Sequence, residues 1–197
     1  MGDPKRATTR SIARTAIRAE LAQVAIELFR RDGFEQVTIS DVAAAAGVSR
    51  STFLRYFGSK EEAVLGAMDV QGVQAAAALR ARPAGEDDWT ALRRTLDPFI
   101  DSYRQNPGSA LALARLVQES PALRVRQLEK RASWLPALAE ALSRRSGHDR
   151  PTPLAPEVRA AAALDCLSIA VAHWTASDGE LDLAELLDQA FAALTTP

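Results

Sequence analysis

The sequence predicts an all-α fold of about nine helices, with a small amino-terminal head of three helices followed by a larger helical bundle. Apolar residues recur at intervals of three and four along most of the chain, and no run alternates as a half-buried strand would. With 197 residues, of which 47% are hydrophobic and 25% charged, the chain is long enough for a small head and one further helical core.

The first helix is expected from about Ser11 to Arg31, where Asp32 and Gly33 end it. Its apolar stripe consists of Ile17, Leu21, Val24, Ala25, Leu28 and Phe29. The ten residues before it form a basic arm with almost no apolar content, which we expect to be unfolded in isolation. This arm is compatible both with reaching a partner and with having no role.

Two short helices around a tight turn are expected next. Thr38, with Asp41 three residues later, has the spacing of a capping box. Gly47 lets the chain turn sharply, because glycine adopts the left-handed conformation without a Cβ penalty. Ser49 can then cap the second helix. The pattern is that of a helix-turn-helix.

The second helix of this pair, residues 50–57, divides into two faces. Phe53 and Phe57 lie one turn apart and are expected to face the protein. The other side chains suit a DNA groove, because arginine can pair with a guanine edge and hydroxyl groups can bond to bases or phosphates. The candidate DNA-binding residues of the head are Thr38, Ser49, Arg50, Ser51, Thr52, Arg55, Tyr56 and Lys60.

Lys60 opens the next helix, for which Ser59 and Glu62 have the spacing of a capping box. A cation in the first turn is disfavoured by the helix dipole. A DNA phosphate would resolve this conflict, whereas a solvated lysine would cost only about 0.3–1 kcal/mol and need no partner. The neighbouring groove-sized residues favour the phosphate contact.

The run DVAAAAGVSRSTFLRYFGSKEEAVLGA, with the preceding ELFRRDGFEQVTI, resembles the amino-terminal DNA-binding domain of the TetR family of bacterial repressors over roughly residues 12–66. The resemblance implies a near-palindromic double-stranded DNA operator as partner. It also implies groove or phosphate contacts from Arg50, Ser51, Thr52 and Tyr56 and a phosphate anchor at Lys60. The sequence departs from the family at Leu54, where a tyrosine is common, so that position has no hydroxyl to offer a phosphate.

Charge is unevenly distributed along the chain. Residues 1–60 hold ten Lys or Arg against six Asp or Glu, and residues 61–197 hold fourteen against nineteen. A cationic head suits DNA, and an acidic body would face protein, solvent or a ligand, although so small a difference also fits ordinary surface variation. We therefore predict an arm and DNA-binding domain at 1–60 and a ligand-binding and dimerisation domain at 61–197.

Helical periodicity continues through the body. Ser120 followed by Pro121 is a cap with a first-turn proline, and Pro98 and Pro136 are expected to bend their helices. The expected helices run from Ser59 to about Ala81, from Trp89 to about Gln105, from Gly108 to Glu119, from Pro121 to about Arg145 and, after the loop SGHDRPTPLAP, from Pro156 to Ala176 and from Leu183 to Leu194.

The stretch RLVQESPALRVRQLEKRASWLPALAEALSRRSG, with the ending DLAELLDQAFAAL, resembles the carboxy-terminal domain of TetR-like regulators that respond to acyl-CoA-like ligands, the group of the mycofactocin regulator. This implies a small hydrophobic or acyl-CoA-like effector with an anionic end. Apolar side chains here could line a pocket or equally fill a core, and Arg115 could pair with the anionic group or reach water. The candidate ligand-binding residues are Leu65, Met68, Leu96, Phe99, Tyr103, Arg115 and Trp134.

The last two expected helices are candidates for dimerisation. Small residues at 160–163 permit close helix approach, and a wide apolar stripe runs from Leu183 to Leu194. These faces could pair with their copies or close the monomer core, and the TetR resemblance implies a homodimer formed through the last two helices. The candidate interface residues are Leu164, Trp174, Leu183, Leu187 and Phe191.

Other functional classes lack the residues they need. There is no apolar run of roughly 18–20 residues and no signal-peptide pattern, so we expect a cytoplasmic protein without membrane contact. The one cysteine, Cys166, excludes an intramolecular disulfide, and with two histidines no metal or catalytic set is visible, so we expect no cofactor and no enzyme activity. The predicted function is a ligand-responsive DNA-binding transcriptional regulator, a repressor released by its effector. The alternatives are an activator of the same fold and a helix-turn-helix that binds protein.

Overall fold

The computed structural model describes residues 9–145 and 154–194, and all regular secondary structure in these ranges is helical. The predicted all-α class is therefore confirmed. The chain divides into two compact units, Met1–Gly66 and Ala67–Pro197, and each is considered by itself. Most of the basic arm and most of the proline-rich loop, residues 1–8 and 146–153, lie outside the described residues.

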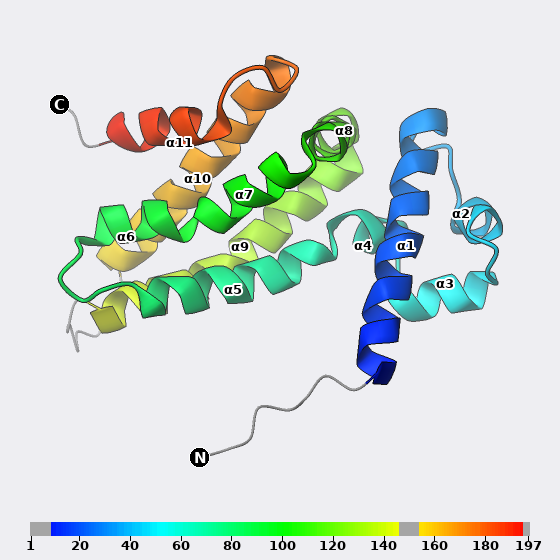
Figure 1. Ribbon diagram of the computed structural model, residues 1–197, viewed down its shortest axis with the longest axis horizontal. Coiled ribbons are helices and arrows are strands. Elements are labelled where there is room, and N and C mark those ends of the chain that lie inside the picture. Colours follow the sequence, from blue (N-terminus) through cyan, green and yellow to red (C-terminus); the bar gives the residue numbers. More distant parts are fainter. Residues whose placement is uncertain (1–8, 146–153, 195–197) are drawn as a thin grey trace. The chain divides into compact units, whose positions relative to one another are not determined.

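Within residues 9–66, the first unit contains four helices (Figure 1): α1 Thr9–Asp32, α2 Ile39–Ala45, α3 Arg50–Phe57 and α4 Lys60–Leu65. Helix α1 packs against α2 and α4, and α3 packs against the same two helices. Phe29, Val42 and Phe53 are fully buried and form the centre of the unit. Because α4 packs onto α1, this unit ends six residues later than the predicted division after residue 60.

The helix expected from Ser59 to Ala81 is two helices, α4 and α5 Ala67–Ala81. Gly66 lies between them, and its backbone keeps a helical conformation (φ −63°, ψ −21°). A Cβ atom at this position would overlap the Arg18 guanidinium and the Glu62 carbonyl oxygen. Gly66 is therefore required by close approach of neighbouring atoms and not by an unusual backbone angle.

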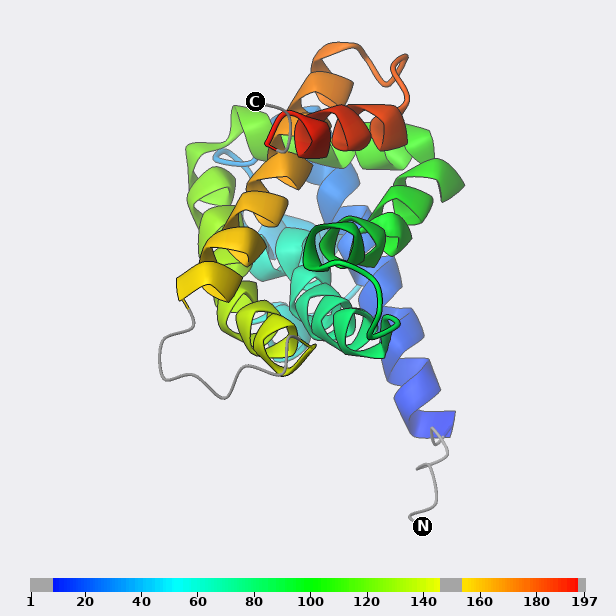
Figure 2. The ribbon, with the colours of Figure 1, turned by 90° about the vertical axis from the view of Figure 1, so that its left-hand side faces the viewer.

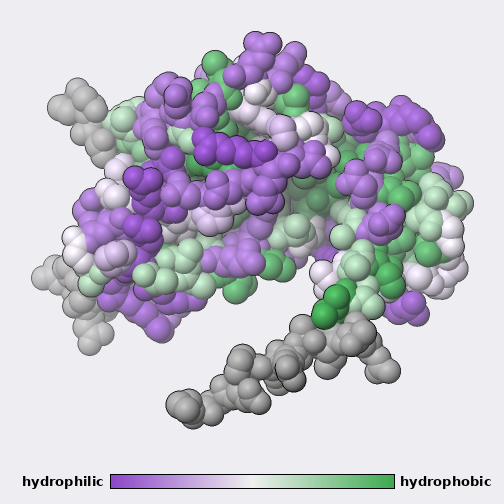
Figure 3. All heavy atoms as spheres, in the orientation of Figure 1, coloured by the Kyte–Doolittle hydropathy of each residue, from purple (hydrophilic) through white to green (hydrophobic). Residues whose placement is uncertain are grey.

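The described part of the second unit contains seven helices: α5, α6 Asp88–Thr95, α7 Asp97–Gln105, α8 Pro107–Glu119, α9 Pro121–Arg145, α10 Leu154–Ala176 and α11 Leu183–Ala192. Helix α9 packs along α5 on one side and against α10 on another, and α11 crosses α10 (Figure 2). One buried cluster that includes Leu92, Trp134, Leu142 and Leu187 joins these helices. The face of this unit seen in Figure 3 is largely hydrophilic, with smaller apolar areas between the hydrophilic ones.

Proline acts differently at two predicted positions. Pro98 was expected to kink one helix, but the helix ends, and α7 restarts at Asp97 with the proline in its first turn. A first-turn proline is tolerated because its missing N–H has no intrahelical partner in any case. Pro121 opens α9 as predicted, and Ser120 accepts a hydrogen bond from the Leu123 N–H (3.4 Å). Sequence reasoning thus placed Pro121 correctly at a helix start, but at Pro98 it predicted a bend within one helix where one helix ends and another begins.

Among residues 9–145 and 154–194, no helix is long and apolar enough to span a bilayer.

Candidate functional site

The first helix of the predicted pair, α2, begins at a complete capping box. The Thr38 Oγ1 accepts from the Asp41 N–H (3.3 Å), and the Asp41 carboxylate accepts from both the Thr38 N–H (2.8 Å) and its hydroxyl (2.7 Å). Hydrogen bonds from Thr38 lower the pKa of Asp41 below its ordinary value. Thr38 is thus a structural cap, and its exposed position also leaves it available to a partner.

The turn between α2 and α3 follows the sequence expectation. Gly47 has φ +66°, in the left-handed region where residues with a side chain are strained. Ser49 caps α3 by accepting from the Thr52 N–H (3.1 Å), and its hydroxyl also donates to Thr52 Oγ1 (3.0 Å). The hydroxyl groups at the start of α3 therefore form a linked set with Ser51, whose Oγ lies 3.0 Å from that of Ser49.

Helix α3 has the two faces that its sequence predicts. Phe53 and Phe57 are buried with ring centroids 5.0 Å apart, which anchors one face in the core of the unit. Arg50, Ser51 and Arg55 are exposed on the other side, and Thr52 and Tyr56 are half-buried. A short helix with a fixed inner face and a basic, hydroxyl-bearing outer face can enter a major groove and reach base edges.

Lys60 is placed differently from the other candidate DNA-binding residues. Its Nζ donates to the carbonyl oxygens of Phe34 (2.7 Å) and Val37 (3.4 Å) and lies 4.3 Å from the centroid of the Phe34 ring. The ammonium group is therefore bound within the first unit. The sequence interpretation gave Lys60 a DNA phosphate as its partner. In this structure its partners are two backbone carbonyls.

The predicted ligand-binding residues are only partly brought together. Leu96 and Trp134 belong to the buried cluster of the second unit, and Met68, Phe99 and Tyr103 pack against it. The Phe99 ring lies 5.5 Å from that of Trp134, and Tyr103 lies 5.2 Å from Trp174. Leu65 belongs to the first unit, where it is buried. Five of the seven candidates therefore share one apolar, aromatic interior.

Arg115 is not part of this interior. Its guanidinium donates to the carboxylate of Asp178 on the surface, in the loop between α10 and α11. Asp178 has φ +56°, a conformation in which Asn and Asp are tolerated better than most residues. Arg115 thus holds the α10–α11 loop, and the expectation that it meets an anionic ligand group finds no support in its position.

The five candidate interface residues, Leu164, Trp174, Leu183, Leu187 and Phe191, are all buried within the single chain. Phe191 packs on Trp89 with centroids 4.4 Å apart, and the Trp89 indole N–H donates to the Phe191 carbonyl (3.2 Å). A side chain that is already covered cannot meet a second copy unless the core opens. These five residues therefore close the core, the alternative that the sequence left open.

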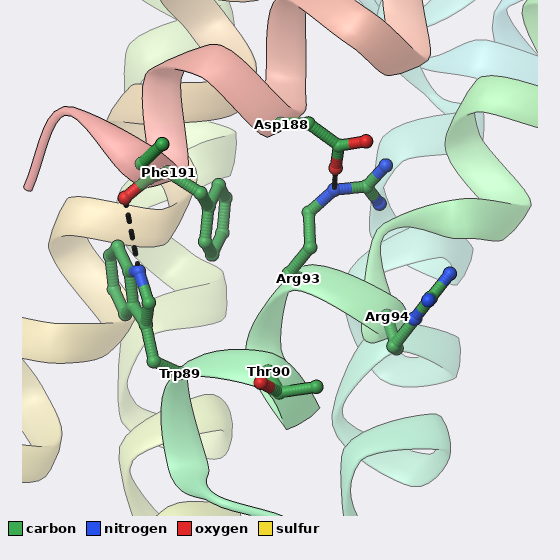
Figure 4. Close-up of a pocket in the computed structure, with 7 residues that line it drawn as sticks. Trp89, Thr90, Arg93, Arg94, Asp188 and Phe191 are labelled. Atoms are coloured by element: carbon green, nitrogen blue, oxygen red, sulfur yellow. Dashed lines mark hydrogen bonds and ion pairs between the residues drawn. The ribbon is translucent and has the colours of Figure 1, made fainter. Parts of the chain in front are cut away.

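A surface pocket of about 220 Å³ lies between α6 and α11 (Figure 4). Trp89 and Phe191 form one wall, and Arg93 on the other side bonds to Asp188 (2.5 Å) and to Asp97 (2.6 Å). Arg93 is therefore paired with two carboxylates, and its bond to Asp188 joins α6 to α11.

Two contacts between α5 and α9 escaped the sequence analysis. Lys130, only 4% exposed, donates to both carboxylate oxygens of Asp69 (2.8 Å each). One turn further on, Trp134 lies so close to Gly72 that a Cβ there would overlap its indole ring. No sequence signal pairs residues about 60 positions apart, although the glycine within a helical pattern hints at close packing.

The fold and the site define an all-helical protein with a helix-turn-helix unit and a separate helical body. Residues 21–66 match the model for bacterial regulatory proteins of the tetR family, and residues 86–197 match the MftR C-terminal domain. The chain belongs to the TetR family of bacterial regulatory proteins, and its body is of the MftR type.

Two named relatives support this membership. The chain is 30% identical to the putative mycofactocin biosynthesis transcriptional regulator MftR of Mycobacterium tuberculosis, over 87% of this chain and 85% of that protein. It is 34% identical to the transcriptional regulator TcmR of Streptomyces glaucescens, over 71% of this chain but only 64% of TcmR. These relatives are regulators, in agreement with the expectation that the chain is not an enzyme.

Solved structures share the fold. The FadR repressor of Thermus thermophilus, in complex with lauroyl-CoA, matches with a TM-score of 0.59 and 24% identity, over 90% of this chain and 93% of that one. The FadR regulator of Bacillus subtilis, in complex with stearoyl-CoA, matches with a TM-score of 0.58 and 19% identity, over 90% and 97%. At these identities the likeness concerns the fold alone.

Proposed function

We propose that the chain is a dimeric repressor that binds a near-palindromic operator and is released by a hydrophobic or acyl-CoA-like effector. The observation that carries DNA binding is α3, whose exposed Arg50, Ser51 and Arg55 stand opposite the buried Phe53 and Phe57. Arginine and serine are the side chains that read guanine edges and bond to phosphates.

DNA binding is tested by selecting genomic fragments with the purified protein and measuring affinity against salt. An interface that neutralises several phosphates loses affinity steeply as salt rises, whereas a helix-turn-helix that binds protein selects no fragment. A reporter gene downstream of the selected operator then separates repression from activation. Reporter output that rises when the protein is present would establish the activator alternative.

The effector proposal rests on the interior formed by Leu96, Phe99, Tyr103 and Trp134 and on the ligands bound to two FadR structures of the same fold. Apart from the Tyr103 hydroxyl and the Trp134 indole N–H, these side chains are apolar, which suits an aliphatic chain. Lauroyl-CoA and stearoyl-CoA should raise the melting temperature and release operator DNA, and free CoA serves as the control. By thermodynamic linkage, operator DNA must weaken effector binding by the same factor by which the effector weakens operator binding.

A pair of substitutions tests where the effector binds. Leu96→Phe adds volume to the buried interior, so a higher concentration of lauroyl-CoA should be needed to release the operator. Leu128→Phe makes the same change on the surface of α9 and should leave release unchanged. Equal behaviour of the two variants would place the effector outside this interior.

The dimer surface that we propose uses exposed residues of the last two helices. Val158 and Ile169 stand on the open face of α10, and Leu194 follows the end of α11. In a two-fold interface each of these residues acts twice, so an apolar face of modest size can hold two copies together. Sedimentation at micromolar concentration should show the dimer.

A further inference from the structure

Three hydroxyl groups at the start of α3 share one set of hydrogen bonds. The Ser49 oxygen accepts from the backbone N–H of Thr52 (3.1 Å), and its hydroxyl donates to Thr52 Oγ1 (3.0 Å). The Ser51 oxygen lies 3.0 Å from that of Ser49, a distance at which either hydroxyl can be the donor. A hydroxyl group has one hydrogen and two acceptor lone pairs, so the directions of these bonds depend on one another.

The backbone fixes the direction of the whole set. An N–H group can only donate, so the Thr52 amide takes one lone pair of the Ser49 oxygen. The single hydrogen of Ser49 is donated to Thr52 Oγ1. Ser49 therefore has no second hydrogen for Ser51, and the bond between these two serines forms only if Ser51 donates to the remaining lone pair of Ser49.

These directions limit what Ser51 offers to DNA. It is exposed and is the second residue of α3, and the first residues of a recognition helix are those that reach base edges. With its hydrogen directed to Ser49, its oxygen offers a partner only lone pairs. Phosphate oxygens, guanine O6 and N7 and thymine O4 are acceptors themselves and gain no hydrogen bond from it. The donors in the major groove are the amino groups at N6 of adenine and N4 of cytosine.

We propose that Ser51 is a specificity-determining residue that accepts a hydrogen bond from the exocyclic amino group of an adenine or a cytosine in the operator. The inference rests on the proposed DNA-binding function and narrows it. A serine without such neighbours can donate or accept and can contact phosphates as well as bases. The bond to Ser49 selects one of these possibilities.

Ser51→Ala locates the base that Ser51 contacts. Parent and variant are compared on operators in which one base pair at a time is changed, and the contacted position is the one at which only the parent discriminates. Affinity for the natural operator should fall about fivefold for each half-site, which corresponds to the loss of one hydrogen bond. Alanine favours helix at this exposed position, so α3 should be retained. Ser109→Ala, at an exposed position of α8, is the matched control and should bind every duplex like the parent.

Base analogues at the contacted position decide which atom Ser51 meets. Purine in place of adenine, or 2-pyrimidinone in place of cytosine, removes the amino group. A 7-deazapurine in the same base pair keeps the amino group and removes N7. On a duplex without the amino group, parent and Ser51→Ala should bind equally, because the contact is absent from both. On the 7-deaza duplex the difference of about fivefold between them should remain.

Two results would overturn the proposal while leaving the proposed function intact. Operator binding by Ser51→Ala that equals that of the parent would mean that the hydroxyl makes no contact. A parental advantage that survived removal of the amino group would mean that Ser51 donates to a base acceptor or a phosphate. Failure of the parent to select any DNA fragment would instead refute the proposed function, and this inference with it.

Discussion

The two units stabilise their helices in different ways. In the first unit, α2, α3 and α4 are only six to eight residues long, and each begins at a hydroxyl cap supplied by Thr38, Ser49 or Ser59. In the second, α9 and α10 have 25 and 23 residues and are joined by contacts between distant residues, such as Lys130 with Asp69.

Short helices are marginal in isolation, so the first unit depends on caps that satisfy its free N–H groups. Longer helices gain more from packing of their faces, so the second unit depends on the fit between them. The comparison predicts that changes to buried side chains of the body lower the free energy of unfolding most. Changes to caps of the head should lower it less, and their effects should stay local.

The largest effect is expected for Phe191→Asp. The ring is 4% exposed and packs on Trp89, so the change creates a cavity worth about 3–5 kcal/mol and buries a charge as well. Thermal unfolding followed by circular dichroism should show a protein largely unfolded at 25 °C. Ile169→Asp, at an exposed position of α10, should stay folded but sediment as a monomer. A folded, monomeric Phe191→Asp protein would return Phe191 to the dimer interface.

Gly72→Ala should destabilise the body by about 1–3 kcal/mol, because the added methyl group would overlap the Trp134 indole. Gly108→Ala is the matched control. It lies in the first turn of α8 with no atom near its would-be Cβ, and should be neutral or stabilising by about 0.4–1 kcal/mol. Urea unfolding of both variants measures the difference. Equal stabilities would show that α5 and α9 can separate at little cost.

Arg50→Ala should leave stability unchanged and lower operator affinity by about 1–3 kcal/mol, with a smaller loss on random DNA. The arginine is exposed at the start of α3, where base edges are reached. Arg144→Ala removes an exposed charge of the body and should bind operator like the parent. Fluorescence anisotropy with operator and random duplexes measures both, and identical binding by all three proteins would reject α3 as the reading helix.

Thr38→Ala should lower stability by about 1 kcal/mol, because the Asp41 N–H in the first turn of α2 loses its acceptor. Thr38→Ser keeps the hydroxyl and should recover most of the stability. Hydrogen exchange should report the loss in α2 and spare α9 and α10. Faster exchange throughout the second unit would contradict the view that caps of the head act locally.

Asp41→Asn should have the smallest effect, and one that depends on pH. Hydrogen bonds from Thr38 lower the pKa of Asp41 in the folded state, so its stabilising contribution is complete above the unfolded pKa of about 3.9 and is lost as pH falls through the folded value. Parent and variant should therefore differ in urea unfolding at pH 7, and the difference should shrink as the pH is lowered below the unfolded pKa of about 3.9. A difference that did not change with pH would assign the effect to something other than this carboxylate.

The helix-turn-helix could be read from the sequence because its determinants are local. Thr38 and Asp41, Gly47, and Ser49 act on backbone groups within three residues of themselves, and Phe53 and Phe57 share a face through helical spacing alone. The same reasoning found Pro121 at the start of α9. It failed at Pro98, where the sequence does not distinguish a bent helix from two helices.

Only the tertiary structure decided the partners of residues far apart in the chain. An amphipathic stripe predicts that Leu187 and Phe191 are covered, but not whether their own chain or a second copy covers them, and here it is their own chain. Likewise, the sequence placed Lys60 at a helix start, but the carbonyls that bind it lie 23 and 26 residues away. Local spacing fixes which groups need partners, whereas the packing of helices determines which partners come within reach.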